Sequence, residues 1–92
     1  MHARVVRFTN VTPERIQEIQ KRIDEADGPP EGVEDSGFKL IHDESQGTAV
    51  FVGFFDDEEK LRKSSEVLEA MDPGDVPGDR ASVDLGEVKV ER

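Results

Sequence analysis

The feature that most constrains this sequence is an unbroken apolar run in its middle, AVFVGFF, at residues 49–55. Successive side chains of a β-strand point to opposite faces of the sheet, and a strand with one solvated face therefore alternates apolar and polar residues. This run does not alternate, so both of its faces are apolar. A strand of this kind must be covered on both sides, and the rest of the chain has to supply the cover.

Four segments are typical of strands because they are short, rich in β-branched and aromatic residues and bounded by turn residues. They cover residues 3–9, 37–44 and 48–55 and a last stretch that begins at Arg80. The short turn-like sequence Ser45-Gln46-Gly47 separates the second from the third, which predicts an antiparallel hairpin. In the last strand the apolar positions change phase across Gly86, so a β-bulge or sharp bend is expected there.

A first helix is expected between the first two strands. Thr12 is a suitable N-cap, and Pro13 fits the first helical position, where its missing N–H is not needed. The apolar stripe of this helix consists of Ile16, Ile19, Ile23 and Ala26. Gly28 and the two prolines that follow it are expected to cap and end the helix.

A second helix is expected directly after the apolar run. Asp56 has the position of an N-cap, and its spacing from Glu59 is that of a capping box. The buried stripe of this helix consists of Leu61, Ser64 or Ser65, Leu68 and Met71, with Val67 on its flank. The acidic residues at its start are therefore interpreted as helix capping and not as a catalytic cluster.

The resulting order is β-α-β-β-α-β, which is typical of the ferredoxin-like fold in the α+β class. The chain of 92 residues has room for one domain, which we assign to residues 1–92. Two helices cover one face of the predicted four-stranded antiparallel sheet, and they leave the other face without a cover.

The uncovered face predicts a homodimer. The apolar residues that we assign to the sheet core or to a dimer contact are Val5, Val6, Phe8, Val50, Phe51, Val52 and Phe54. Four strands of ordinary length leave an open face of about 400 Å². Monomeric proteins rarely expose a continuous apolar patch larger than a few hundred Å². Two copies that pack their open faces together would remove this surface from water and form a dimeric α/β barrel.

The charge of the chain restricts its partners. There are 22 acidic residues against 12 basic ones, for a formal net charge of −10. This sign repels phosphate backbones and anionic lipids, so neither nucleic acid nor a membrane is an expected partner. The chain contains no cysteine, and MHARVVRF lacks the apolar core of a signal peptide, so a cytoplasmic location is expected.

Four segments resemble one known family: MHARV at the start, GFK at 37–39, DEEKLRKS at 57–64 and PGDRASV at 77–83. They are similar to small dimeric α/β-barrel proteins related to antibiotic biosynthesis monooxygenases. The resemblance implies a homodimer joined through its sheets, with a cavity between sheet and helices in each subunit. Some members oxidise aromatic molecules without a cofactor, and others degrade haem. The chain lacks the Trp and Tyr residues of these sites, and Val6 occupies the place of an early-strand Asn.

Three residues are candidate ligand contacts. His42 follows the phase of the apolar residues in its strand and is a candidate base or hydrogen-bond partner, although a partly exposed structural histidine is the commoner case. Arg7 is a candidate anchor for an anion, with a carboxylate pair or a dimer contact as the plainer role. Asn10 is a candidate for orienting a ligand, with turn chemistry as the alternative. No residue is assigned as catalytic.

No metal or cofactor is expected. Asp72, Asp75 and Asp79 do not have the spacing of a calcium-binding EF-hand loop, and two histidines are too few for a zinc site.

The sequence favours a small-ligand-binding or structural dimer, and the possible ligand is small and apolar. A cofactor-free monooxygenase that acts on a small apolar or aromatic molecule is the alternative. An RNA-recognition module is a remote one, since Phe51-Val52-Gly53-Phe54 matches half of the third-strand signature of such modules but the basic and aromatic half is absent.

Overall fold

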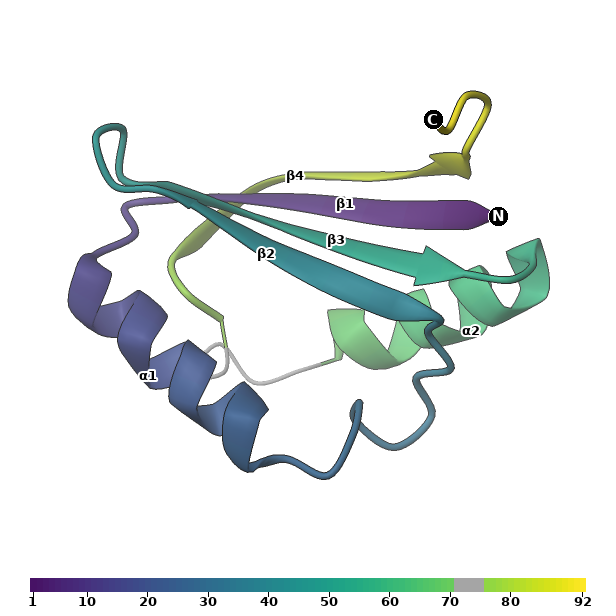
Figure 1. Cartoon of the computed structure of the whole chain (residues 1–92), viewed down its shortest axis with the longest axis horizontal. Helices are drawn as coiled ribbons and strands as arrows, with labels where there is room; N and C mark the ends of the chain where they lie inside the picture. The colour runs from purple at the N-terminus through teal and green to yellow at the C-terminus, as the bar shows by residue number, and fades with distance from the viewer. Residues whose placement is uncertain (71–75) are drawn as a thin grey trace.

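The chain folds into one four-stranded sheet with two helices beneath it (Figure 1). The elements are β1 (His2–Thr9), α1 (Pro13–Glu25), β2 (Gly37–Asp43), β3 (Thr48–Phe55), α2 (Glu58–Glu69) and β4 (Asp79–Glu87). The strand order is β2-β3-β1-β4, and all neighbouring strands are antiparallel. This computed structural model describes residues 1–70 and 76–92. The fold is ferredoxin-like, as the sequence predicts, and both helices lie on the same face of the sheet.

The pairing of β1 with β3 decides which side chains lie on each face. Val6 pairs with Phe51, and Arg4 pairs with Gly53, so these positions share the face that the helices cover. Val5 pairs with Val52 on the open face. The apolar residues of the open face are Ala3, Val5, Ile41, Val50, Val52 and Phe54. No element of the described chain covers them, and Ile41 is 53 % exposed.

The core lies between the sheet and the helices in two clusters. The larger one consists of Val6, Phe8, Val11, Ile16 and Ala49, and the smaller one of Val33, Phe55 and Leu61. Phe8 and Phe51 meet edge to face, with their ring centroids 5.9 Å apart and their planes at 84°. This geometry is favoured for aromatic pairs, so it fixes Phe51 on the helix side of β3.

Helix α1 begins as the sequence predicts and ends differently. The Thr12 hydroxyl accepts a hydrogen bond from the backbone N–H of Arg15 at 3.2 Å. At the other end Ala26 is already extended, with φ −81° and ψ 143°, and its N–H donates to the Ile23 carbonyl. The predicted glycine cap at Gly28 is therefore wrong, because the chain leaves the helix two residues earlier.

Helix α2 is capped by Asp57 and not by Asp56. The Asp57 carboxylate accepts a hydrogen bond from the backbone N–H of Lys60 at 2.8 Å. Asp56 instead accepts one from the Ser36 hydroxyl, at 2.6 Å, just before β2. The prediction of an Asp56 cap, with its capping box to Glu59, is wrong: the Asp56 carboxylate bonds to Ser36 and pairs with the Lys60 side chain at 3.7 Å, and Asp57 caps the helix.

The buried side of α2 matches its predicted stripe. Leu61, Ser64 and Ser65 are buried, Val67 and Leu68 are half-buried, and Met71 lies outside the described residues. The Ser64 hydroxyl accepts a hydrogen bond from the backbone N–H of Glu34 at 3.0 Å. This bond ties the connection between α1 and β2 to the helix that faces it.

The irregularity of β4 lies near its start and not at Gly86. Ser82 pairs with Arg7 and Arg80 pairs with Phe8, so Ala81 is the extra residue of a β-bulge. Gly86 pairs with Ala3 in unbroken register. The predicted bulge at Gly86 is therefore wrong. The phase change that suggested it arises because Val88 lies beyond the strand, where its N–H still donates to the Met1 carbonyl at 2.9 Å.

Candidate functional site: an apolar cavity beneath the sheet

A cavity of about 490 Å³ lies between the sheet, α1 and the connection that leads from α1 to β2. Figure 1 shows this connection passing below the sheet, on the same side as the two helices. The apolar side chains that line the cavity are Val6, Phe8, Ile19, Ile23, Ala26, Pro29, Pro30, Val33, Phe38, Phe51, Phe55, Leu68 and Val76. Its charged lining residues in the described chain are Arg4, Arg22, Asp35 and Arg80. The site is a mainly apolar space with a few charged groups on its walls.

Gly53 shapes the part of the cavity that the sheet forms. It lies between Phe38 of β2 and Arg4 of β1 in one row across the sheet, and all three line the cavity. A Cβ at Gly53 would lie 3.3 Å from Cε2 of Phe55, so the Phe55 ring leans over the glycine. Because glycine has no side chain, it leaves room for the Phe55 ring, and no side chain projects from the sheet into the cavity at this position.

Arg4 is the buried charge of the site. Its side chain is 10 % exposed, and its guanidinium group donates from Nε to the Ser65 hydroxyl at 3.3 Å and from Nη2 to Glu69 Oε1 at 3.1 Å. Arg80 donates from Nη1 to the other oxygen of Glu69. The hydrogen bond from Arg80, followed by that from Arg4, lowers the pKa of Glu69. Two guanidinium groups thus share one carboxylate at the end of α2.

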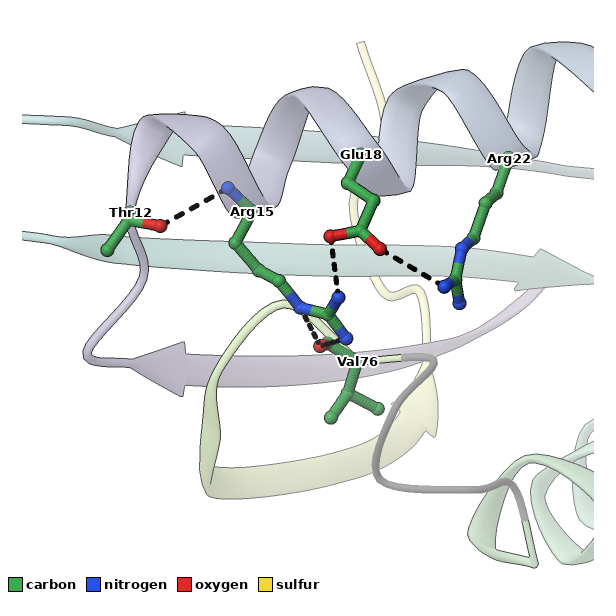
Figure 2. Close-up of polar contacts among 5 residues, drawn as sticks. All are labelled: Thr12, Arg15, Glu18, Arg22 and Val76. Atoms are coloured by element: carbon green, nitrogen blue, oxygen red, sulfur yellow. Dashed lines mark hydrogen bonds and ion pairs between the residues drawn. The ribbon is translucent and has the colours of Figure 1, made fainter.

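Arg15 ties α1 to Val76, one of the residues that line the cavity. Figure 2 shows its guanidinium group reaching from α1 to the carbonyl of Val76, which leads into β4. Nε and Nη2 donate to this carbonyl oxygen at 3.1 and 2.9 Å, while Nη1 donates to Glu18 at 2.9 Å. Glu18 also accepts a hydrogen bond from Arg22 at 3.1 Å, so a chain of polar contacts runs along the side of α1 that faces Val76.

Asp35 is the one carboxylate among the described lining residues. It is half-buried, and burial raises its pKa above the usual value. In the part of the chain that the structure describes, no hydrogen bond or ion pair is found for this carboxylate. Asp35 is therefore a partly desolvated acid at the edge of an apolar space, which is an environment that functional carboxylates often have.

Two of the residues predicted to contact a ligand lie away from the cavity. Arg7 is exposed on the open face of the sheet, where it pairs with Val50. Asn10 has a left-handed backbone, with φ 55°, and donates from its side chain to Asp79 at 2.7 Å. Asparagine is one of the few residues that adopt this conformation readily. Asn10 therefore turns the chain after β1, and its side chain ties this turn to the start of β4.

His42 lies on the helix-covered face, in the phase of Phe38 and Leu40, as expected from the sequence. It pairs with Ala49, and it is not among the residues that line the cavity. Its Nε2 atom is buried and has no hydrogen-bond partner in the described chain. Ligand binding by these three residues stays a prediction, and the cavity does not bring them together.

Sequence reasoning missed Arg4, Asp35 and Arg80. The signal for Arg4 was present, because it has the same two-residue phase as Val6 and Phe8, whereas Arg7 has the opposite one. An arginine in phase with buried residues must point toward the core. Arg80 and Asp35 gave no such signal. Arg80 precedes the bulge at Ala81, which interrupts the phase of its strand, and Asp35 lies in a loop, which has no phase.

Among residues 1–70 and 76–92, no cluster of three or more possible metal ligands is present, and no helix has the length and apolar character needed to span a bilayer. Asp72 and Asp75 lie outside this described part. No protein-family model, no curated protein and no solved structure matches the chain.

Proposed function

We propose that this protein binds a small, mainly apolar molecule in the cavity beneath its sheet and performs no chemistry on it. The cavity of about 490 Å³ is the observation that supports this function. Ligand sites of proteins typically occupy about 300–1,000 Å³, are lined mainly by apolar and aromatic side chains, and contain a few polar groups. Close-packed protein interiors contain few voids larger than a water molecule, so a space of this volume is more than a packing defect.

We propose further that the protein works as a homodimer in which two open sheet faces pack together. The six apolar side chains of this face have no cover within the described chain. The resemblance to dimeric α/β-barrel proteins supports the same arrangement. In such a dimer each subunit keeps its own cavity, because the helices and the dimer contact lie on opposite faces of the sheet.

An enzymatic role of the monooxygenase type is the second candidate, and Asp35 is the observation that favours it. Its raised pKa and its apolar surroundings suit a carboxylate that removes a proton from a bound molecule. Against this role, the described lining residues include no histidine, and the whole chain contains no tyrosine, tryptophan or cysteine. Binding without catalysis is therefore preferred.

An RNA-recognition role is disfavoured by the position of Phe51. Such modules stack bases on aromatic side chains of the exposed sheet face. Phe51 lies on the opposite face and packs against Phe8 in the core. The net charge of −10 also repels RNA.

Binding can be tested with a neutral apolar dye, N-phenyl-1-naphthylamine, whose fluorescence rises in apolar surroundings. The Ile23→Trp variant places a large ring into the cavity from α1, where Ile23 is half-buried. The dye should bind the unchanged protein at micromolar concentration and should lose at least about tenfold in affinity in this variant. Absence of dye binding to the unchanged protein would refute the proposed function.

The matched control is Ile41→Trp, which adds the same ring to the open face, where Ile41 is exposed. Dye affinity should stay unchanged in this variant. Light scattering at micromolar concentration tests the dimer: the unchanged protein should have twice the mass of one chain. Val52→Glu places a charge at the centre of the open face and should give monomers. A monomeric unchanged protein would refute the dimer and leave the cavity proposal intact.

A further inference from the structure

The charged groups among the described lining residues of the cavity are mainly positive, whereas the chain as a whole is acidic. Three guanidinium groups and one carboxylate are found among its described lining residues, namely Arg4, Arg22, Arg80 and Asp35. The chain as a whole has 22 acidic and 12 basic residues. A random selection of its charged side chains would therefore be mainly acidic. The arginines of the lining are offset by Glu69, which pairs with Arg4 and Arg80, and by Glu18, which pairs with Arg22.

Arg22 is paired with Glu18, whereas Arg4 and Arg80 are only partly neutralised by their neighbours. Arg4 and Arg80 both donate to Glu69, each to one of its two oxygens, so two positive charges share one negative charge. Within the described part of the chain, the hydrogen bonds of Arg4 use Nε and Nη2 and leave Nη1 without a partner. A guanidinium group carries five N–H donors in a planar fork that matches the oxygens of a carboxylate or sulfonate.

Burial makes this arrangement effective for binding. The Arg4 side chain is 10 % exposed, and taking a charge out of water is costly unless opposite charge and hydrogen bonds compensate it. Electrostatic attraction is stronger beside apolar walls than in bulk water. An anionic group that reaches Arg4 and Arg80 would complete the neutralisation that Glu69 provides only in part.

We infer that the cavity binds amphipathic anions, molecules with an apolar body and one carboxylate or sulfonate group. The apolar body lies against the phenylalanine side of the cavity, formed by Phe38, Phe51 and Phe55, and the anionic group meets Arg4 and Arg80. This inference rests on the proposed ligand-binding function and specifies the class of ligand. An organic cation is disfavoured, because it would have Asp35 alone as a partner and three arginines as neighbours.

A matched pair of dyes tests the inference. N-phenyl-1-naphthylamine and 8-anilinonaphthalene-1-sulfonate share the same apolar skeleton, and only the second carries an anionic group. The sulfonate should bind at least about tenfold more tightly than the neutral dye, as expected for one charged hydrogen-bonded contact. Equal affinities, or tighter binding of the neutral dye, would overturn the inference and leave the proposed function intact. Binding of neither dye would refute both.

Two charge-neutral variants locate the anionic group. Arg80→Gln should weaken the sulfonate about tenfold and leave the neutral dye unchanged, because glutamine removes the charge of a half-exposed side chain and keeps most of its length. Arg7→Gln removes the same charge from the opposite face of the sheet and should change neither affinity. If Arg7→Gln weakens the sulfonate and Arg80→Gln does not, the anion binds on the open face and the inference is wrong. Circular dichroism of each variant verifies that it is folded.

Discussion

Gly78 lies so close to the end of β1 that a Cβ added to it would be 2.4 Å from the carbonyl oxygen of Thr9. The same Cβ would lie 3.0 Å from Cγ2 of Val11 and 3.3 Å from the carbonyl oxygen of Asn10. Real Cβ atoms do not approach a backbone oxygen this closely, so any other residue at this position requires a backbone shift. The glycine allows the segment that leads into β4 to pack directly on the turn after β1.

Replacing this glycine is expected to destabilise the fold. Gly78→Ala should lower the free energy of unfolding by about 2–4 kcal/mol, because a rigid backbone atom and not a movable side chain is in the way. Urea denaturation followed by circular dichroism measures the change.

Gly86→Ala is the matched control, since nothing lies within 4 Å of its added Cβ and its register in β4 is regular. We expect a change within about 0.5 kcal/mol there. A large loss of stability at Gly86 with none at Gly78 would show that the strand bends at Gly86 after all.

The cap of α2 gives a second prediction. Asp57→Ala removes the carboxylate that accepts from the Lys60 N–H and should cost about 1 kcal/mol of unfolding free energy. Asp57→Ser keeps an oxygen in reach of the same N–H and should cost much less. Thermal denaturation at neutral pH compares the two. Equal losses in both variants would show that the charge of Asp57, and not its capping bond, stabilises the helix.

The pair of arginines on Glu69 predicts a dependence of stability on pH. Hydrogen bonds from Arg80 and Arg4 lower the pKa of Glu69 in the folded state. A carboxylate with a lowered folded pKa stabilises the fold above its unfolded pKa, here 4.5, and loses this contribution as the pH falls through the folded value. The unchanged protein should therefore melt at a higher temperature than Glu69→Gln at pH 7.

The melting difference between these two proteins should shrink as the pH falls below 4.5. Because other carboxylates titrate in both proteins, only the difference between the two melting temperatures is informative. A difference that stays constant from pH 7 to about pH 3 would contradict the assigned role of Glu69.

The fold was accessible from the sequence because its signals are local and repeated. The period of Ile16, Ile19 and Ile23, the cap at Thr12 and the hairpin before Thr48 each depend on a few neighbouring residues. The structure agrees with these three predictions, and it places the strands in the expected ferredoxin-like order. Local patterns fix the type and sequence of the elements even in a chain as charged as this one.

The errors occurred where a distant residue decides between two local options. Asp56 and Asp57 are equally good caps by sequence. In the structure Asp57 caps the helix, while Asp56 accepts a hydrogen bond from Ser36, 20 residues away, and pairs with Lys60. The bulge in β4 lies at Ala81 because β1 requires that register, and no residue near Ala81 indicates it. The cavity is a similar case, because its described walls come from all six helices and strands and from the connection before β2, and no local pattern contains the distances between them.

The central position of β1 has a consequence for how the chain reaches this structure. β1 lies between β3 and β4, and Ala3 pairs with Gly86 almost at the other end of the sequence. During synthesis β1 leaves the ribosome before β4, so β1 must wait for β4 before its second edge is paired. Contacts of such long sequence separation slow folding, because the chain must close a large loop before they form. Until then the backbone groups along this edge of β1 stay unpaired, and an unpaired strand edge makes the nascent chain prone to aggregation before β4 arrives.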